Sequence, residues 1–204
     1  MGEAIIHGII LAFGLIIPLG VQNVFVFNQG ASQLNIWRAA PVVLTASICD
    51  TLLILIAVQG VSLVLLTFSW LTNTLYMIGF FFLLYMGLVI WRSNSSNDVK
   101  QEISMPVKKQ ILFAASVSLL NPHAILDTIG VIGTNSIQYI GSEKWAFTLA
   151  TIIVSWIWFI CLALAGKFLK RLDSTGKTIV LLNKFSSLII WGVALYMLKQ
   201  VIYS

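Results

Sequence analysis

Charge is the scarcest property of this 204-residue sequence, because only 9% of its residues are charged while 59% are hydrophobic. An ordinary soluble domain has about 25% charged residues. A chain this poor in charge cannot cover a water-facing surface with polar groups, so lipid must form much of its solvent. The mean hydropathy of +0.97 agrees with an integral membrane protein.

Cysteine is nearly absent as well, with only Cys49 and Cys161, which are far apart in the sequence. Two isolated cysteines give neither a disulfide framework nor a metal motif. No phosphate-binding loop, dinucleotide fingerprint, HExxH zinc motif or serine-nucleophile motif occurs. We therefore expect no cofactor, no bound metal and no enzymatic activity. The net charge of +5 does not indicate a nucleic-acid partner, because the basic residues cluster in loops beside apolar segments.

Long apolar runs fill most of the chain. A helix needs about 20 apolar residues to cross a bilayer, and six segments are long enough. The sixth, 110–133, is interrupted by a polar motif. The pattern predicts an all-α, polytopic membrane protein with six transmembrane helices. The five uninterrupted segments are 4–27, 39–66, 68–91, 145–166 and 179–202.

The basic residues predict the orientation, since lysine and arginine accumulate in cytoplasmic loops. With six crossings, the first, third and fifth loops and the adjoining helix ends carry ten of the twelve basic residues. The other side has Lys144 and Lys199. Both termini are therefore expected outside, although a half-inserted segment would leave five crossings and move one terminus inside.

The polar segment 92–109 divides the chain into a first half, 1–91, and a second half, 110–204. Three helices in each half would give the halves opposite orientations, which is the inverted-repeat plan of many transporters. Short motifs recur at one offset. Pro18 stands five residues before Asn23 and Pro122 five before Asp127, an offset of 104, and Gly87 matches Gly192 at an offset of 105. We read 92–109 as a cytoplasmic linker between two three-helix repeats.

Each repeat is predicted to begin with a broken helix, the first at Pro18 and Gly20 and the second at Pro122. A proline inside a helix costs roughly 3 kcal/mol, and irregular backbone at membrane depth is tolerated only where protein buries it or a wet cavity lines it. Simple kinks are the alternative. A break exposes the N-terminus of a half-helix, which suits a carboxylate. Polar residues lie beside both breaks, namely Gln22, Asn23, Asn121, His123 and Asp127.

Two of the seven acidic residues, Asp50 and Asp127, fall inside spans. Burying a charge there costs at least about 2.5–3.5 kcal/mol, and such acids usually line a solute or proton pathway. No lysine or arginine lies deep enough in a span to pair with either. The two acids therefore predict binding of a cation, which is a proton, a metal ion or an organic ammonium group. His123, four residues before Asp127, is a candidate hydrogen-bond partner for it.

Three motifs, "PLGVQNVFVFNQG" (18–30), "ASICDTLLI" (46–54) and "NPHAILDT" (121–128), resemble the LysE/ArgO family of amino acid exporters. The resemblance covers essentially the whole chain, with the motifs in family order. Relatives that export neutral amino acids tend to have a Pro-Gly-Pro first motif and a lysine after the Asn-Pro. This sequence has Pro-Leu-Gly and His123, which resembles the basic amino acid branch.

The resemblance implies a multi-pass protein of the bacterial cell membrane that exports L-arginine, L-lysine or both. Export would use proton antiport and alternating access, with protons and membrane lipid as the other partners. The six polar residues Gln22, Asn23, Asp50, Asn121, His123 and Asp127 are the expected substrate-binding or proton-coupling residues. Export of neutral amino acids or of a divalent metal ion are the alternatives. The sequence leaves open arginine against lysine, and whether the chain forms a homo-oligomer.

Overall fold

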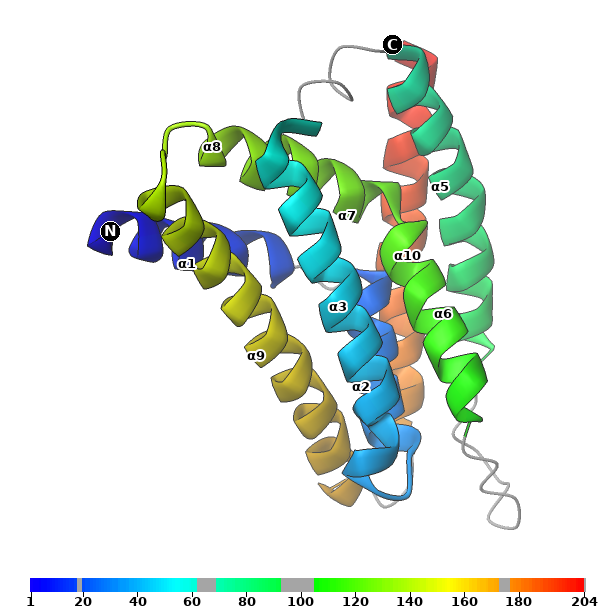
Figure 1. The fold of residues 1–204 in the computed structure, drawn as a ribbon. Helices are drawn as coiled ribbons and strands as arrows, with labels where there is room; N and C mark the ends of the chain where they lie inside the picture. The colour runs from blue at the N-terminus through cyan, green and yellow to red at the C-terminus, as the bar shows by residue number, and fades with distance from the viewer. Residues whose placement is uncertain (18–19, 62–68, 93–104, 173–176, 204) are drawn as a thin grey trace.

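The structure is a computed structural model that describes residues 1–17, 20–61, 69–92, 105–172 and 177–203. Within these ranges the chain is helical and contains no strand, which confirms the predicted all-α class for this part of the chain. The helices form an elongated bundle (Figure 1).

The first half of the chain contributes the helices coloured blue to cyan in Figure 1, and the blue-green helix α5 beside α10. Asn35 begins a 3-10 turn, because its side chain accepts a hydrogen bond from the Trp37 N–H. Gly60 adopts a φ of 98° within a π-helical turn, a conformation that glycine reaches without steric cost. The elements are α1 (Gly2–Ile16), α2 (Val21–Ser32), the 3-10 turn η1 (Ile36–Ala39), α3 (Ala40–Ile56), the π-helical η2 (Ala57–Val61) and α5 (Ser69–Trp91).

The second half begins with α6 at Val107, inside the predicted linker 92–109, of which residues 93–104 lie outside the described part. Pro122 is the first residue of α7, a position where its missing N–H costs nothing. The elements are α6 (Val107–Leu119), α7 (Pro122–Asp127), the π-helical η3 (Thr128–Gly133), α8 (Thr134–Ser136), α9 (Ser142–Leu172) and α10 (Lys177–Tyr203).

Interruptions are present at both proline motifs. α1 ends at Ile16 and α2 begins at Val21, and the two helices are bent by 80°. Gly20 is the extended residue before α2, with φ −78° and ψ 172°, whereas Pro18 lies outside the described residues. At the second motif the chain leaves α6 through Asn121, whose backbone is extended (φ −88°, ψ 98°). Figure 1 shows α6 along the bundle and α7–α8 turned across it.

The outer face of α9 is a continuous apolar stripe. Its members recur every three or four residues, so they share one side of the helix. Polar and small residues, such as Thr151 and Ser155, are buried on the opposite side. Such an apolar surface is what lipid covers. The exposed residues of the stripe are Leu149, Ile153, Ile157, Ile160, Leu164 and Phe168.

Two helical stretches of the described chain, Ile36–Gly60 and Ser142–Leu172, are long and apolar enough to cross a membrane. The bent pair α1–α2 would be a third if both helices belong to one span. The number of six crossings stays a prediction.

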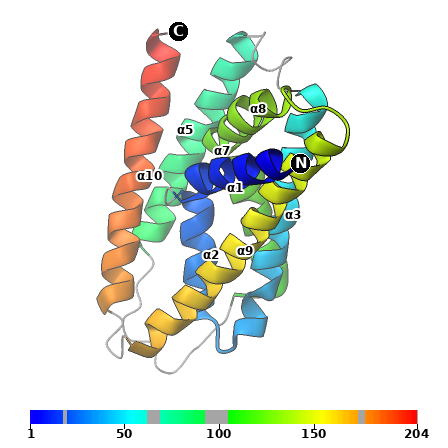
Figure 2. The same cartoon turned by 90° about the vertical axis from the view of Figure 1, so that its left-hand side faces the viewer.

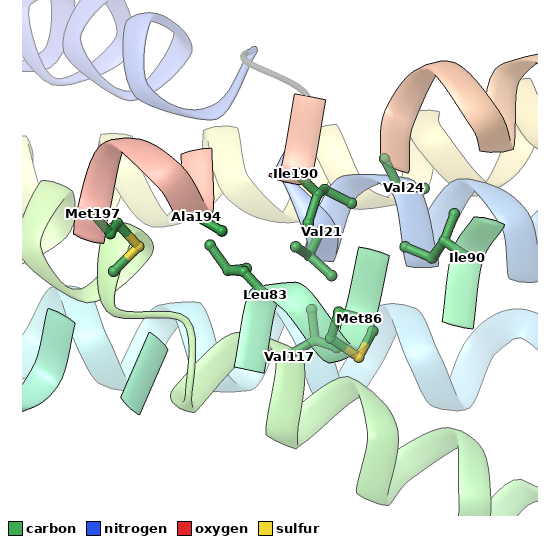
Figure 3. Packing of buried hydrophobic residues seen from close by; sticks show 9 residues of the cluster. All are labelled: Val21, Val24, Leu83, Met86, Ile90, Val117, Ile190, Ala194 and Met197. Carbon is green, nitrogen blue, oxygen red and sulfur yellow. The ribbon is translucent and has the colours of Figure 1, made fainter. Parts of the chain in front are cut away.

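Helices from the two halves pack against each other throughout the bundle. α5 lies along α10, α1 and α2 both contact α9, and α3 contacts α6 and α9. Figure 2 shows α10 and α5 at one edge of the bundle and α9 crossing α2. One apolar cluster joins α2, α5, α6 and α10 (Figure 3). Its buried members are Val21, Val24, Leu83, Met86, Ile90, Val117, Ile190, Ala194 and Met197.

α2 and α9 approach so closely that glycine is required on both helices. A Cβ atom on Gly30 would lie 2.1 Å from the Ala163 carbonyl oxygen, and one on Gly166 would lie 2.1 Å from the Phe27 carbonyl oxygen. Small residues permit this kind of backbone contact between membrane helices. Nearby, the Lys167 ammonium donates to the Gln33 and Leu34 carbonyls, each at 2.8 Å. α2 is therefore fixed to α9 at its C-terminal end.

Candidate functional site

A cavity of about 220 Å³ lies where the two broken segments approach each other. Elements of both halves contribute to its wall, including α1, α2 and α3 from the first and α7, η3, α9 and α10 from the second. Its wall is mainly apolar, and its size suits one small solute rather than a drug-sized ligand, for which about 300–1,000 Å³ is usual. The polar lining residues are Gln22, Asn23, Asp50, Asn121, Asp127, Thr128, Thr151 and Ser155.

Most of the residues predicted from the sequence line this one cavity. They come from separate elements, since Gln22 and Asn23 belong to α2, Asp50 to α3 and Asp127 to the end of α7. Gly20 and Asn121, at the two breaks, line it as well. The binding or proton-coupling role of these residues stays a prediction.

Three predicted residues are placed only in part or not at all. Pro18 lies outside the described residues. The backbones of Pro122 and His123 form the first turn of α7, but their side chains are outside the described part of the structure. The expected hydrogen bond between His123 and Asp127 therefore stays a prediction.

The carboxylate of Asp50 receives a hydrogen bond on Oδ2 from the hydroxyl of Ser155, which belongs to α9. One residue further along both helices, the Trp156 indole donates to Thr51 Oγ1 at 3.0 Å. These two contacts join α3 to α9 beside the cavity. The sequence offered no signal for Ser155, because a serine in an apolar helix ordinarily bonds a carbonyl of its own helix.

Asn23 bridges the first break. Its side-chain Nδ2 donates to the carbonyl oxygen of Ile16 at 2.6 Å, and its Oδ1 accepts from the Trp158 indole at 3.3 Å. Ile16 is the last residue of α1, so the Asn23 amide satisfies a carbonyl that the end of that helix leaves unpaired. Asn23 thus connects α1, α2 and α9.

Two buried polar atoms of the lining lack a hydrogen-bond partner among the described residues. They are Gln22 Nε2, a donor, and Asn121 Oδ1, an acceptor. A buried polar group without a partner costs about 1–3 kcal/mol. A solute that carries both an acceptor and a donor would remove both penalties, as an amino acid with its carboxylate and ammonium groups does.

The N-terminus of α2 lies at the cavity and has no side-chain cap among the described residues. Its first intrahelical hydrogen bond runs from the Val24 N–H to the Gly20 carbonyl. The N–H groups of Val21 and Gln22 therefore have no acceptor within the described residues of the helix. Together with the helix dipole, such N–H groups favour an anion.

The second carboxylate, Asp127, is the last residue of α7 and is followed by the π-helical η3. The Tyr76 phenol of α5 is close enough to the Asp127 carboxylate for the two groups to interact electrostatically. η3 also packs against η2, the π-helical turn that ends α3. π-Helical turns are rare and often occur at functional sites. Asp127 therefore stands on a less regular element than Asp50.

No group of three or more histidine, cysteine, aspartate or glutamate side chains in the described residues is arranged to hold a metal ion.

The model of the family described as "LysE type translocator" matches residues 13–201 of the chain. YisU of Bacillus subtilis (strain 168), named as a candidate amino-acid transporter, is 55% identical over 194 residues, covering 95% of this chain and 88% of that protein. The arginine exporter protein ArgO of Escherichia coli (strain K12) is 32% identical over 199 residues, covering 95% of this chain and 92% of ArgO.

ArgO of Pectobacterium carotovorum subsp. carotovorum (strain PC1) is 30% identical over 204 residues, covering 98% of each chain. No solved structure matches the chain. The family match includes both broken segments and the helices α2, α3, α5, α7 and α9, together with the end of α1 and most of α10. The chain belongs to the LysE type translocator family.

Proposed function

We propose that this protein is a secondary active exporter of basic L-amino acids, arginine or lysine, in the bacterial cell membrane. The observation that carries the proposal is the pairing of two carboxylates, Asp50 and Asp127, from opposite halves of the chain in one small cavity. No lysine, arginine or histidine is among the described residues that line it. The names of the ArgO relatives, which are arginine exporters, support the same substrate class.

An amino acid fits the cavity by its charges. Its α-carboxylate is placed at the N-terminus of α2, where backbone N–H groups and Gln22 Nε2 are donors. Its α-ammonium group is placed near Asn121 Oδ1. A basic side chain then brings a second cation to the carboxylates. A neutral amino acid carries no side-chain cation for these carboxylates, so basic amino acids are the better match.

The six crossings in two inverted halves, 1–91 and 110–204, are part of the proposal. Several contacts between helices support this plan: α1 packs on α9 as α6 packs on α3. In the same way, α2 contacts α10 and α7 contacts α5. α3 with α9, and α5 with α10, are pairs of equivalent helices in contact. Transporters of this plan bind substrate at the interface of their repeats.

The basic residues support an orientation with both termini outside. The α2–α3 connection, the end of α9 and the start of α6 lie at one end of the bundle (Figures 1 and 2). These segments carry Arg38, the pair Lys170 and Arg171, and the pair Lys108 and Lys109. Lysine and arginine concentrate on the cytoplasmic side, so this end is assigned to the cytoplasm.

Proton antiport is proposed because a basic amino acid carries a positive charge out of the cell. Carrying one positive charge outward against an inside-negative potential costs about 2.3 kcal/mol per 100 mV. Exchange for one incoming proton removes that electrical cost. Asp50 and Asp127 are the groups proposed to hold the proton and the substrate cation in alternation.

The test is export from vesicles that contain the purified protein and are loaded with labelled arginine. Export is measured with and without a proton gradient directed toward the arginine-containing side. Faster export with the gradient is expected, and equal rates would refute the coupling to protons. Loading with lysine, citrulline or a divalent metal ion in place of arginine measures the substrate class. Export of citrulline or metal but not of arginine would refute the proposal.

A further inference from the structure

α3 and α9 meet through pairs of residues that occupy equivalent positions in the two halves. Asp50 contacts Ser155 and Thr51 contacts Trp156, and both pairs are 105 residues apart. The same spacing relates Gly87 to Gly192, and a spacing of 104 relates the two proline motifs. Asp50 and Ser155 are therefore counterparts in the proposed repeat.

α5 and α10 show a similar contact, displaced by one residue from the counterpart of Gly87. The Trp191 indole lies against Gly87, since a Cβ atom on this glycine would be 2.1 Å from Trp191 Nε1. The two residues are 104 apart in the sequence. Trp191 Nε1 also donates to the Leu84 carbonyl at 3.3 Å.

In a two-fold arrangement, a residue touches its own counterpart only where both lie beside the axis. The Asp50–Ser155 contact therefore marks a point beside the internal two-fold axis, and the contact of Gly87 with Trp191, the neighbour of Gly192, lies close to a second such point. At the first point the cavity opens between the halves, because both Asp50 and Ser155 line it. The first half contributes a carboxylate to this point and the second half a hydroxyl.

We propose that Ser155 is a positioning residue for transport, whose hydroxyl holds the Asp50 carboxylate beside the axis, where it receives the side-chain cation of a basic amino acid. The inference rests on the function proposed above. In this proposal, Asp50 from the first half and Ser155 from the second half together form one cation-binding position. Without the hydroxyl, the carboxylate would lose a fixed direction and a charge-assisted hydrogen bond.

The contact itself gives the expected effect of substitution. Ser155→Ala leaves the Asp50 carboxylate in place but no longer fixes its rotamer, so the substrate binds less tightly. The conformational change of transport should be unaffected. The KM for arginine should rise about tenfold, the effect of one lost hydrogen bond to a charged group, and the maximal rate should change less than about twofold. Ser155→Thr keeps the hydroxyl and should restore a KM within about twofold of the unsubstituted protein.

Thr148→Val is the matched control. Thr148 is also a buried hydroxyl residue of α9, but its Oγ1 donates to the Lys144 carbonyl of its own helix and it does not line the cavity. Its replacement should leave the KM unchanged. A general loosening of α9 would instead affect both variants and would also lower the maximal rate.

Exchange of the two side chains is the sharper test. Because Asp50 and Ser155 are in hydrogen-bond contact, an aspartate on α9 would put its carboxylate close to the place that the α3 carboxylate occupies. Asp50→Ser alone should abolish export, and Asp50→Ser combined with Ser155→Asp should recover a measurable part of it.

These experiments use the purified protein in vesicles, with export measured over a range of internal arginine concentrations and the amount of inserted protein determined for each variant. A KM of Ser155→Ala equal to that of the unsubstituted protein would overturn the inference, as would an exchanged pair that is inserted normally but is as inactive as Asp50→Ser. If the exchanged pair is not inserted, the Ser155→Ala and Ser155→Thr results decide. Absence of arginine and lysine export by the unsubstituted protein would instead refute the proposed function.

Discussion

The two breaks each contain an asparagine, but the side chains are used differently. Asn23, after the first break, bonds the last carbonyl of α1 and the Trp158 indole. Asn121, in the second break, has a buried Oδ1 that lacks a partner among the described residues. The comparison indicates that the first asparagine stabilises the broken backbone, whereas the second is the one that we propose to bind a solute. Residue type and position near a break do not by themselves assign a binding role.

The breaks also differ in that only the second is followed by an acidic residue at this position. Asp127 occupies the position in the second half that Asn23 occupies in the first, so the proposed site has a carboxylate at only one of the two equivalent places. Asp127→Asn should make both places neutral and lower arginine export at least about a hundredfold, since an intramembrane acid of a transport site has no substitute. Membrane insertion should be unchanged.

The measurement is arginine efflux from vesicles, normalised to the amount of inserted protein. Asp50→Asn is a comparison variant that should lose export to a similar degree. A fully active Asp127→Asn protein would remove this residue from the mechanism and would make the two breaks functionally alike.

The helix that follows the first break is held more tightly than the segment that follows the second. A Cβ atom on Gly166 of α9 would be 2.1 Å from the Phe27 carbonyl of α2, whereas one on Gly130 of η3 would have no atom within 4 Å. Gly166→Ala should therefore force α2 and α9 apart and reduce stability by about 3 kcal/mol, the upper range for overpacking. Gly130→Ala should change stability much less.

Thermal unfolding of the purified variants in detergent measures this difference. A transition temperature for Gly166→Ala equal to that for Gly130→Ala would contradict the tight α2–α9 contact. In that case α2 would be no better anchored than η3.

The sequence predicted those features that depend on local composition. Apolar runs predicted the helices, as shown by α9, which spans Ser142–Leu172 around the predicted segment 145–166. Proline motifs predicted the two interruptions. The intramembrane acids stood out because a charge in a membrane segment is costly. Each of these signals lies within a short stretch of the chain.

Other features depend on contacts between distant segments and were not predictable. Nothing local distinguishes Ser155, which bonds Asp50, from Ser118, which bonds its own helix. The bridging bonds of Asn23 depend on how far the chain turns at the break, which a proline motif does not specify. The π-helical turns η2 and η3, from different halves of the chain, pack against each other, a contact that no local sequence pattern specifies.

Asn121 offers a prediction specific to the second break. Asn121→Ala removes a buried acceptor that has no partner among the described residues, so stability should be retained or slightly improved. If Oδ1 receives the ammonium group of the solute, the KM for arginine should rise about tenfold, while the maximal rate changes less. An unchanged KM would mean that the unpaired oxygen does not contribute to binding.

Asn23→Ala is the counterpart at the first break and should give the smallest effect. It removes the bonds to the Ile16 carbonyl and the Trp158 indole. Hydrogen bonds between membrane helices contribute about 0.6 kcal/mol on average, so stability should fall by about 1 kcal/mol. The KM of the folded protein should change less than in Asn121→Ala. Both variants are measured for thermal unfolding and for the arginine KM. Asn23→Ala should lose stability and keep its affinity, whereas Asn121→Ala should lose affinity and keep its stability. If both variants instead lost affinity equally with no loss of stability, the bridging bonds of Asn23 would be incidental and the two breaks would contribute to binding in the same way.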